Sequence, residues 1–241
     1  MISIIIPTLQ EEKVIASTLS GLKAFHSIPH EIIVSDGGSS DQTVAIARQY
    51  ADRVIVHDGG MRQTIAQGRN AGARAAEGEF LIFLDADCTI ENPDAFFSAA
   101  LAHFAADPRL VALTAYLRVL PSEETLADKL IFGLMNFATR IRNNVMQKGD
   151  APGGEFQMVR RAAFESVGGY RGDLVTREDR DLFARLAGIG RILTDPELTV
   201  FHTGRRAHNV GWTRLILLFF ANTISFRLRG KLVSKEWKPE R

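Results

Sequence analysis

Two aspartates one residue apart, Asp85 and Asp87, are the residues of this chain whose spacing most directly suggests chemistry. They follow five consecutive apolar residues, 80–84, a pattern typical of a buried strand in a parallel sheet. Ligands of open α/β sheets bind beyond the carboxyl ends of the strands. Carboxylate oxygens there suit Mg²⁺ or Mn²⁺, and such an ion would hold a diphosphate. A solvated turn could have the same sequence, so the interpretation depends on what else lies at strand ends.

Other polar residues are expected at the same edge of the sheet. Pro7, Thr8 and Glu12 lie in the segment after the first apolar run, and Asp36 follows the second. A carboxylate in the position of Asp36 can accept hydrogen bonds from a base or a ribose. Each residue alone is more typical of a turn or a helix cap, but their order along the chain predicts a nucleotide-diphosphate site.

Basic residues could complete this site. Arg62 and Arg69 flank the third connection between strands. There they could contact phosphate or orient the carboxylates of Asp36 and Asp85, since guanidinium groups form bidentate bonds with both kinds of anion.

A second group of candidates lies near residue 200. His202 stands at the end of an expected strand, where it could be a further metal ligand, a diphosphate contact or an ordinary strand-end histidine. Arg205 and Arg206 could clamp phosphate or form a solvated basic turn.

The hydrophobic periodicity predicts alternating strands and helices through the first ninety residues. We expect strands at 3–6, 31–35, 53–57 and 80–84, and helices at 11–25, 43–50 and 63–76. This alternation predicts an α/β fold with a doubly wound, mainly parallel sheet.

The pattern changes after residue 87. We expect helices at 94–105, 125–147, 162–167 and 178–187, and strands at 111–119, 153–159 and 198–202. The predicted organisation is one domain over 1–205, with a nucleotide-binding half (1–90) and an acceptor-side half (91–205), followed by a helical tail over 206–241.

Composition narrows the function classes. The chain has 241 residues, a net charge of +1 and a single cysteine, Cys88. The charge gives no reason to expect nucleic acid as a partner. The single cysteine excludes an internal disulfide and fits a reducing, cytoplasmic compartment. We interpret the N-terminus as a strand and expect no transmembrane helix, because no run approaches 18 apolar residues.

Several motifs together resemble family 2 glycosyltransferases of the GT-A fold. Those motifs are the segments 4–8, 31–41, 68–72 and 78–87, and further along 153–156, 164–170 and 178–182. The resemblance covers about residues 2–205. It implies a Rossmann-like domain that binds a nucleotide-diphosphate sugar, with a mixed, mainly parallel sheet.

The resemblance also implies roles for single residues on the donor side. Pro7, Thr8 and Glu12 would line the nucleoside pocket. Asp36 would contact the base, which is typically uracil in this family, and Arg69 would lie near the same pocket.

The reaction centre follows from the same resemblance. Asp85 would approach the ribose or the sugar, Asp87 would bind Mg²⁺ or Mn²⁺, and Asp179 would be the catalytic base. Inverting transfer needs a carboxylate opposite the leaving diphosphate to take the proton of the acceptor hydroxyl. Glu178 and Asp179 also begin an expected helix, where carboxylates are favoured by the helix dipole alone.

The tail raises the question of a membrane. Residues 215–221 are apolar on every face and are bracketed by basic residues, which suits the interface of a bilayer. The segment 212–228 could therefore contact the inner face of the membrane peripherally, or pack on the protein's own core, or form a homodimer. The long helix expected at 125–147 has few charges and would favour a lipid-linked acceptor if it faced the same way.

The leading hypothesis is an inverting, metal-dependent glycosyltransferase. It would move a sugar from a UDP-linked donor to an acceptor hydroxyl, such as that of a lipid-linked or bacterial cell-envelope glycan. The alternative is a non-catalytic protein of the same fold that binds a nucleotide sugar or docks on a membrane. A sugar-phosphate nucleotidyltransferase and a Rossmann dehydrogenase are disfavoured, because no glycine-rich phosphate loop follows the first strand.

Overall fold

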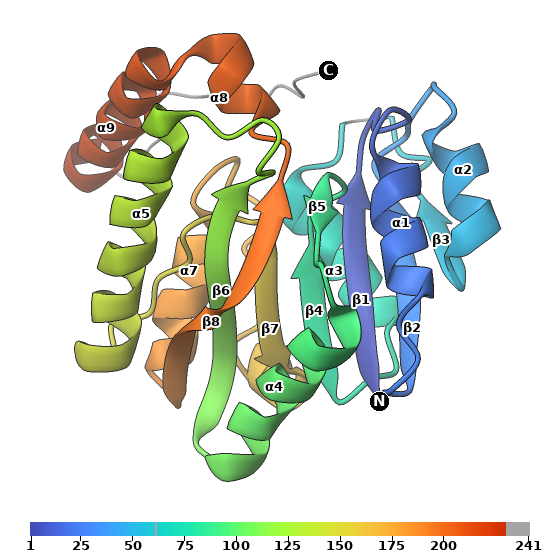
Figure 1. The fold of residues 1–241 in the computed structure, drawn as a ribbon, viewed down its shortest axis with the longest axis horizontal. Helices are drawn as coiled ribbons and strands as arrows, with labels where there is room; N and C mark the ends of the chain where they lie inside the picture. The colour runs from blue at the N-terminus through green and yellow to red at the C-terminus, as the bar shows by residue number, and fades with distance from the viewer. Residues whose placement is uncertain (61, 230–241) are drawn as a thin grey trace.

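One mixed sheet of eight strands forms the centre of the part of the chain that the structure describes. The structure is a computed structural model, and it describes residues 1–60 and 62–229. The strand order is β3-β2-β1-β4-β7-β6-β8-β5 (Figure 1). The strands are β1 (Ile2–Thr8), β2 (His30–Asp36), β3 (Arg53–Val56), β4 (Phe80–Leu84), β5 (Cys88–Thr89), β6 (Leu110–Val119), β7 (Phe156–Arg160) and β8 (Arg191–His202). The helices are α1 (Ile15–Lys23), α2 (Thr43–Tyr50), α3 (Ile65–Ala75), α4 (Pro93–Ala106), α5 (Leu126–Arg140), the π-helical turn η1 (Ile141–Val145), α6 (Arg161–Ser166), α7 (Glu178–Ala187), α8 (Arg205–Val210) and α9 (Trp212–Arg229).

The sheet is mainly parallel in its first half and mixed in its second. Strands β1 to β4 pair in parallel, whereas β7 runs antiparallel to both β4 and β6. The predicted fold class, an α/β fold with a mixed, mainly parallel sheet and a C-terminal helix, is confirmed.

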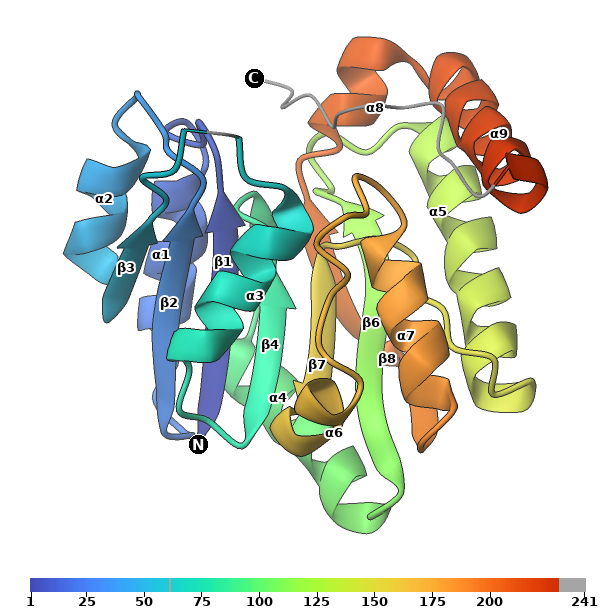
Figure 2. The same cartoon turned by 180° about the vertical axis from the view of Figure 1, so that it is seen from behind.

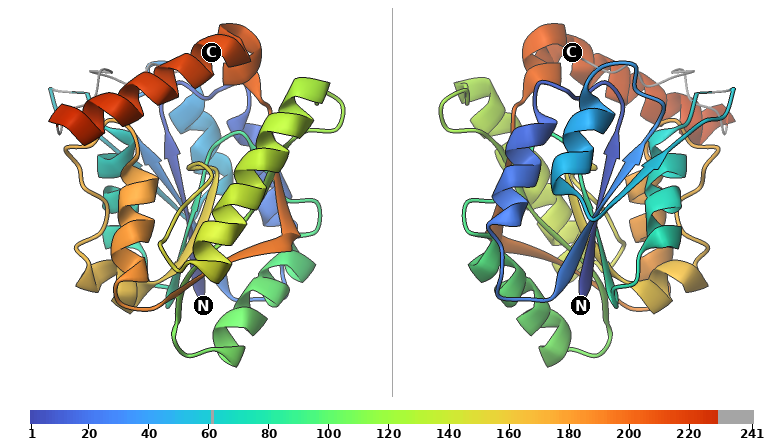
Figure 3. Two further views of the ribbon diagram at one scale, coloured as in Figure 1. Left: turned by 90° about the vertical axis from the view of Figure 1, so that its left-hand side faces the viewer. Right: turned by 90° about the vertical axis from the view of Figure 1, so that its right-hand side faces the viewer.

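Helices cover both faces of the sheet (Figure 3). Alternate residues of β1 point to opposite faces: Ile4 and Ile6 join the cluster with α1, α2 and α4, and Ile5 joins the cluster with α3, α6 and α7. On the second face α3 approaches closely, because a Cβ at Gly72 would lie only 2.3 Å from Cγ2 of Ile5.

The carboxyl ends of six strands meet at one edge of the sheet (Figures 1 and 2). Strands β1, β2, β3, β4, β6 and β8 end there, while β7 and α7 begin there. This edge therefore collects the loops that carry the residues singled out in the sequence.

The structure differs from the sequence-based elements in its second half. The helix expected at 125–147 ends as an α-helix at Arg140 and continues as one π-helical turn. Strand β8 begins at Arg191 rather than at 198, because a bulge opposite β6 accommodates the polar segment 195–198. The short elements β5 and α8 were not predicted.

The C-terminal segment forms the helix α9, as expected. At its start the Trp212 ring packs against Phe132 of α5 with 5.4 Å between centroids, so this end of the helix is part of the core. In the chain up to residue 229, residue 61 aside, the structure contains no helix with the length and apolar character needed to cross a bilayer.

Candidate functional site

Six carboxyl groups from distant parts of the chain gather at the carboxyl edge of the sheet. They belong to Glu11 after β1, Asp85 and Asp87 after β4, Glu155 before β7, and Glu178 and Asp179 at the start of α7. The predicted residues Asp85, Asp87 and Asp179 are thus brought into one site. Glu11, Glu155 and Glu178 join them there, although the sequence analysis assigned them no role in the site.

Arg69 of α3 is the buried cation at the centre of this cluster. Its side chain is 1% exposed and donates hydrogen bonds of 3.0 Å to Asp85, to Glu178 and to the carbonyl of Gly154. A Cβ at Gly154 would lie 2.1 Å from the Arg69 Nη2, so only glycine fits there. Burial alone would lower the pKa of Arg69, but the neighbouring carboxylates, Asp85 first, outweigh it and raise that pKa. Arg69 therefore orients Asp85, one of the roles expected for it.

Arg205 is the second cation of the site. It pairs with Glu11 at 2.7 Å and with Asp87 at 3.3 Å, and Thr203 donates a hydrogen bond of 2.7 Å to the same oxygen of Asp87. Arg205 thus neutralises carboxylates rather than standing free as a phosphate clamp. Arg206 follows it on α8, and Arg62 lies exposed in the loop before α3.

Glu11, not Glu12, enters the site. Glu12 is exposed and its carboxylate accepts a hydrogen bond from the backbone N–H of Gln42, away from Asp87. Burial raises the pKa of Glu11 to about 7. The two glutamates are adjacent, and they follow a residue with a left-handed backbone, Gln10 (φ 61°). The hydrophobic periodicity of the sequence does not show which of the two glutamates lies among the carboxyl groups.

Asp36 is fully buried, and its carboxylate already has four protein donors. Its oxygens accept hydrogen bonds from Thr8 Oγ1 (2.9 Å), Ser39 Oγ (2.6 Å) and the backbone N–H groups of Gly38 and Ser39 (3.0 and 2.7 Å). These bonds shape the loop after β2 and connect it to the end of β1. Asp36 thus fixes the backbone of this loop beside Pro7 and Thr8, which pair with the end of β2.

The electrostatic balance of the site is negative. Burial raises the pKa of Glu155 to about 8 and that of Glu178 to about 7, and it also raises the pKa of Asp179. The Oε2 atom of Glu155 is buried with no hydrogen-bond partner in the described structure. Because carboxyl groups outnumber the neighbouring guanidinium groups, the site favours protons or added cations.

His202 lies at the end of β8, beside the Asp87 carboxylate. Burial lowers its pKa, so the imidazole is neutral. Its Nδ1 accepts a hydrogen bond of 3.1 Å from the N–H of Gly204, and its buried Nε2 has no partner among the described residues. This bond places the proton of the neutral ring on Nε2. That tautomer can donate to an anion; ligation of a metal through Nε2 would require the other tautomer.

The carboxylate oxygens of the site fit a divalent metal ion that is also bound by the phosphates of a substrate. In the structure of residues 1–60 and 62–229, no three His, Cys, Asp or Glu side chains form a ready metal cage. Mg²⁺ does not need one, since it is commonly held by one or two carboxylates together with substrate phosphates and water. Asp85 and Asp87 lie together after β4, and their role as metal ligands remains a prediction.

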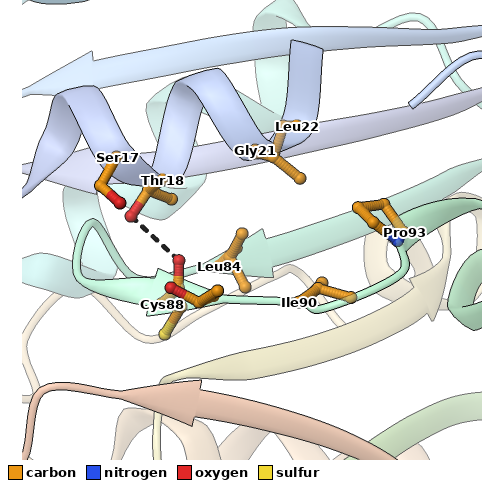
Figure 4. Close-up of a pocket in the computed structure, with 9 residues that line it drawn as sticks. Ser17, Thr18, Gly21, Leu22, Leu84, Cys88, Ile90 and Pro93 are labelled. Carbon is orange, nitrogen blue, oxygen red and sulfur yellow. Dashed lines mark hydrogen bonds between the residues drawn. The ribbon is translucent and has the colours of Figure 1, made fainter. Parts of the chain in front are cut away.

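The turn that carries the two aspartates is fixed from behind by α1. Thr18 Oγ1 donates hydrogen bonds to the carbonyls of Ala86 (2.7 Å) and Cys88 (2.9 Å), and a small pocket with mainly apolar walls lies beside these bonds (Figure 4). Burial raises the pKa of the Cys88 thiol well above its usual range. Cys88 therefore acts as a small hydrophobic residue.

A mixed, mainly parallel sheet with helices on both faces and acidic residues gathered at its carboxyl edge is the architecture of the GT-A fold. The model of the family described as "Glycosyl transferase family 2" matches residues 3–168. The chain therefore belongs to glycosyl transferase family 2, which confirms the family expected from the motifs.

Curated relatives match parts of the chain. It is 35% identical over 120 residues to validoxylamine A glucosyltransferase of Streptomyces hygroscopicus subsp. limoneus, which is 47% of this chain and 26% of that protein. It is 26% identical over 199 residues to the O-antigen chain rhamnosyltransferase RfbN of Salmonella typhimurium, 78% of this chain and 62% of that protein. The chain thus spans between about a quarter and three fifths of the length of these two relatives.

Solved structures share the fold. The mannosyltransferase PcManGT from Pyrobaculum calidifontis, in complex with GDP-Man and Mn²⁺, superposes with a TM-score of 0.72 at 20% identity, over 96% of this chain and 65% of that one. S. aureus TarS 1–349 in complex with UDP superposes with a TM-score of 0.64 at 20% identity, over 96% of this chain and 75% of that one.

Proposed function

We propose that this protein is an inverting, metal-dependent glycosyltransferase that moves a sugar from a uridine-diphosphate sugar to an acceptor hydroxyl. The observation that carries the proposal is the set of buried carboxyl groups around Asp85, Asp87 and Asp179, whose excess negative charge would be offset by a divalent cation. Membership of family 2 supports the same reaction class.

The donor would lie across the carboxyl ends of β1, β2 and β4. Pro7, Thr8, Glu12 and Asp36 would border the nucleoside, whereas Glu11, paired with Arg205, would lie nearer to Asp87. The complexes of PcManGT with GDP-Man and Mn²⁺ and of TarS with UDP support a nucleotide sugar on this fold.

Asp87 and Asp85 would hold Mg²⁺ or Mn²⁺ beside the diphosphate. When bound, the ion would neutralise the charge that develops on the leaving diphosphate. His202 would donate from Nε2 to a diphosphate oxygen, and Arg205 would exchange its contact with Asp87 for one with phosphate. Glu11 would remain within reach of Arg205 in both arrangements.

Asp179 would be the catalytic base. Its pKa is raised by burial, and a carboxylate of raised pKa accepts a proton more readily from the attacking hydroxyl. The neighbouring Arg180 bonds Asp150 at 2.6 and 2.9 Å, and Arg142 pairs with the same carboxylate at 2.8 Å. This network fixes the first turn of α7 and with it the position of Asp179.

Calorimetry with purified protein tests the donor side. We expect UDP to bind more tightly than GDP, CDP or TDP, and only with Mn²⁺ or Mg²⁺ present. Asp87→Ala should lose the metal-dependent part of UDP binding, whereas Asp173→Asn, a change of an exposed carboxylate paired with Arg171, should keep it. Unchanged UDP affinity in Asp87→Ala would contradict the assigned metal ligand.

Turnover tests the base. Asp179→Asn should abolish sugar transfer, and any hydrolysis of the UDP-sugar donor, while UDP binding with Mn²⁺ stays within about twofold of the parent. Equal loss of binding and turnover would assign Asp179 to donor binding instead. A parent protein that binds UDP and Mn²⁺ but neither transfers nor hydrolyses the sugar would support the non-catalytic alternative.

A further inference from the structure

An apolar stripe on the outer face of α5 and η1 is exposed along its whole length. Leu126, Leu130, Leu134 and Phe137 are 79%, 70%, 70% and 59% exposed, and Val145 in the π-helical turn is 71% exposed. Ile141 and Met146 extend the same surface. We call these seven residues the α5 stripe. Helix α5, which carries the stripe, lies on the outside of the ribbon (Figure 3, left), and the stripe covers about 30 Å of helix at 1.5 Å per residue.

The stripe cannot turn inward, because the opposite face of α5 is anchored. Asn136 exchanges hydrogen bonds of 3.1 and 2.9 Å with the backbone of Leu117 in β6. Asp128 is fully buried and accepts hydrogen bonds from Trp212 (2.7 Å) and His208 (2.9 Å). Phe132 packs between His202 and Trp212. The helix therefore buries a face that carries Asp128, Phe132, Asn136 and Thr139, and it leaves its more apolar face outside.

The charges beside the stripe are positive. Between residues 126 and 148 the basic residues are Lys129, Arg140, Arg142 and Lys148, of which Arg142 pairs with Asp150 at 2.8 Å, and the one acidic residue is the buried Asp128. Just before the helix, Glu124 already pairs with Arg118 at 2.7 Å and with Lys129 at 3.8 Å. The surface that carries the stripe is therefore apolar with a net positive border.

We propose that the α5 stripe docks on an anionic lipid bilayer, with α5 and η1 lying parallel to the membrane plane. Leucine and phenylalanine side chains would enter the acyl boundary, and the lysine and arginine stems would extend to the headgroups. Each basic residue near an anionic surface adds attraction that salt weakens. Helix α9 adds the exposed Ile216, Leu217 and Arg214 close to the start of α5.

Charge favours lipid over a second copy of the chain as the occupant. A two-fold dimer buries the same patch on both subunits. Pairing two α5 stripes would bring Lys129 and Arg140 of both copies to one interface, with no exposed carboxylate between residues 126 and 148 to meet them. Anionic headgroups offer the missing countercharge. This inference stands on the surface alone and does not rest on the proposed function.

Vesicle flotation tests the proposal with the full chain. We expect the protein to float with phosphatidylcholine vesicles that contain phosphatidylglycerol, to float poorly with phosphatidylcholine alone, and to be released by high salt. Substituting Leu130, Leu134 and Phe137 together by glutamine should weaken vesicle binding by at least about a hundredfold, because three large apolar side chains no longer enter the acyl boundary. Their exposure means that the fold should survive, which circular dichroism and the melting temperature would verify.

Matched variants keep the outcome decisive. Ile189→Gln removes an apolar residue that is 53% exposed elsewhere and should leave flotation unchanged. Lys129→Gln with Arg140→Gln should reduce binding and its salt dependence. The proposal is overturned by absence of flotation with phosphatidylglycerol, or by flotation that survives the triple substitution but is lost on changing Ile216 and Leu217. The proposal is also overturned if the protein does not bind vesicles and light scattering shows a dimer that Leu134→Gln dissociates.

Discussion

Replacing Glu155 by glutamine should stabilise the protein at alkaline pH and change little at acidic pH. Glu155 is buried beside Asp85 and Asp87, and its Oε2 has no hydrogen-bond partner in the described structure. Burial raises its pKa from 4.5 to about 8. The folded protein therefore keeps this proton over a pH range in which the unfolded chain has lost it.

The sign and size of the effect follow from proton linkage. Between pH 4.5 and about 8 the folded state binds one proton more than the unfolded state, so the free energy of unfolding falls as pH rises through this window. At about 1.4 kcal/mol per pKa unit, the loss approaches about 5 kcal/mol near the upper end. Glutamine has nearly the same shape and no charge, so Glu155→Gln should recover most of this free energy near pH 8 and little near pH 4.5.

Guanidinium unfolding of parent and variant, with a chelator present, at about pH 5 and about pH 8.5 measures the difference. Glu165→Gln, which changes a carboxylate that is 65% exposed, is the control and should show no such pH dependence. If the stabilisation by Glu155→Gln is the same at both pH values, or if it is larger at the acidic one, then Glu155 is not held protonated by burial and the reasoning is wrong.

Three further substitutions test the charge balance of the site and the packing of the helices. Arg69→Met should destabilise the fold by about 3–5 kcal/mol in chemical unfolding near neutral pH, because it leaves the carboxylates of Asp85 and Glu178 buried without their guanidinium partner; a loss within about 0.5 kcal/mol, typical of a surface change, would contradict that role. Gly72→Ala should cost about 1–3 kcal/mol, because the new Cβ meets Ile5. Gly133→Ala, where a Cβ meets nothing within 4 Å, should instead stabilise α5 by about 0.5–1 kcal/mol, and the same sign for both would refute the packing argument.

Much of the fold and part of the site could be predicted from the sequence because they depend on local patterns. The apolar run 80–84 gave the observed bounds of β4, and periodicity gave those of α2. The carboxyl ends of such strands must share an edge, so Asp85 and Asp87 were predicted together. Asp179 was found through a family motif rather than through periodicity, and its role remains a prediction.

The rest depends on contacts that a linear pattern does not contain. The expected strand at 153–159 placed Glu155 in its interior, whereas β7 begins at Phe156 and leaves Glu155 among carboxyl groups from β4 and α7. The burial of the Glu155 carboxyl group depends on residues that are distant in the sequence, so it could not be predicted from the sequence. In α5 the more apolar face is outside, and only the contacts of Asp128, Phe132 and Asn136 with the rest of the protein show which face is inside.

Helix α8 connects the carboxyl cluster of the candidate site with helix α5, which carries the α5 stripe. This helix begins with Arg205, whose guanidinium reaches Asp87 and Glu11, and it carries His208, whose Nε2 lies 2.9 Å from Asp128 of α5. Gly204 starts it with a left-handed backbone (φ 65°), which turns the chain directly from the end of β8 toward α5. The cation that faces the proposed metal carboxylate is thus positioned by an element bonded to the inner side of the proposed membrane-docking helix. A protein resting on a bilayer through α5 would therefore hold the carboxyl edge of its sheet in a fixed orientation relative to the headgroups.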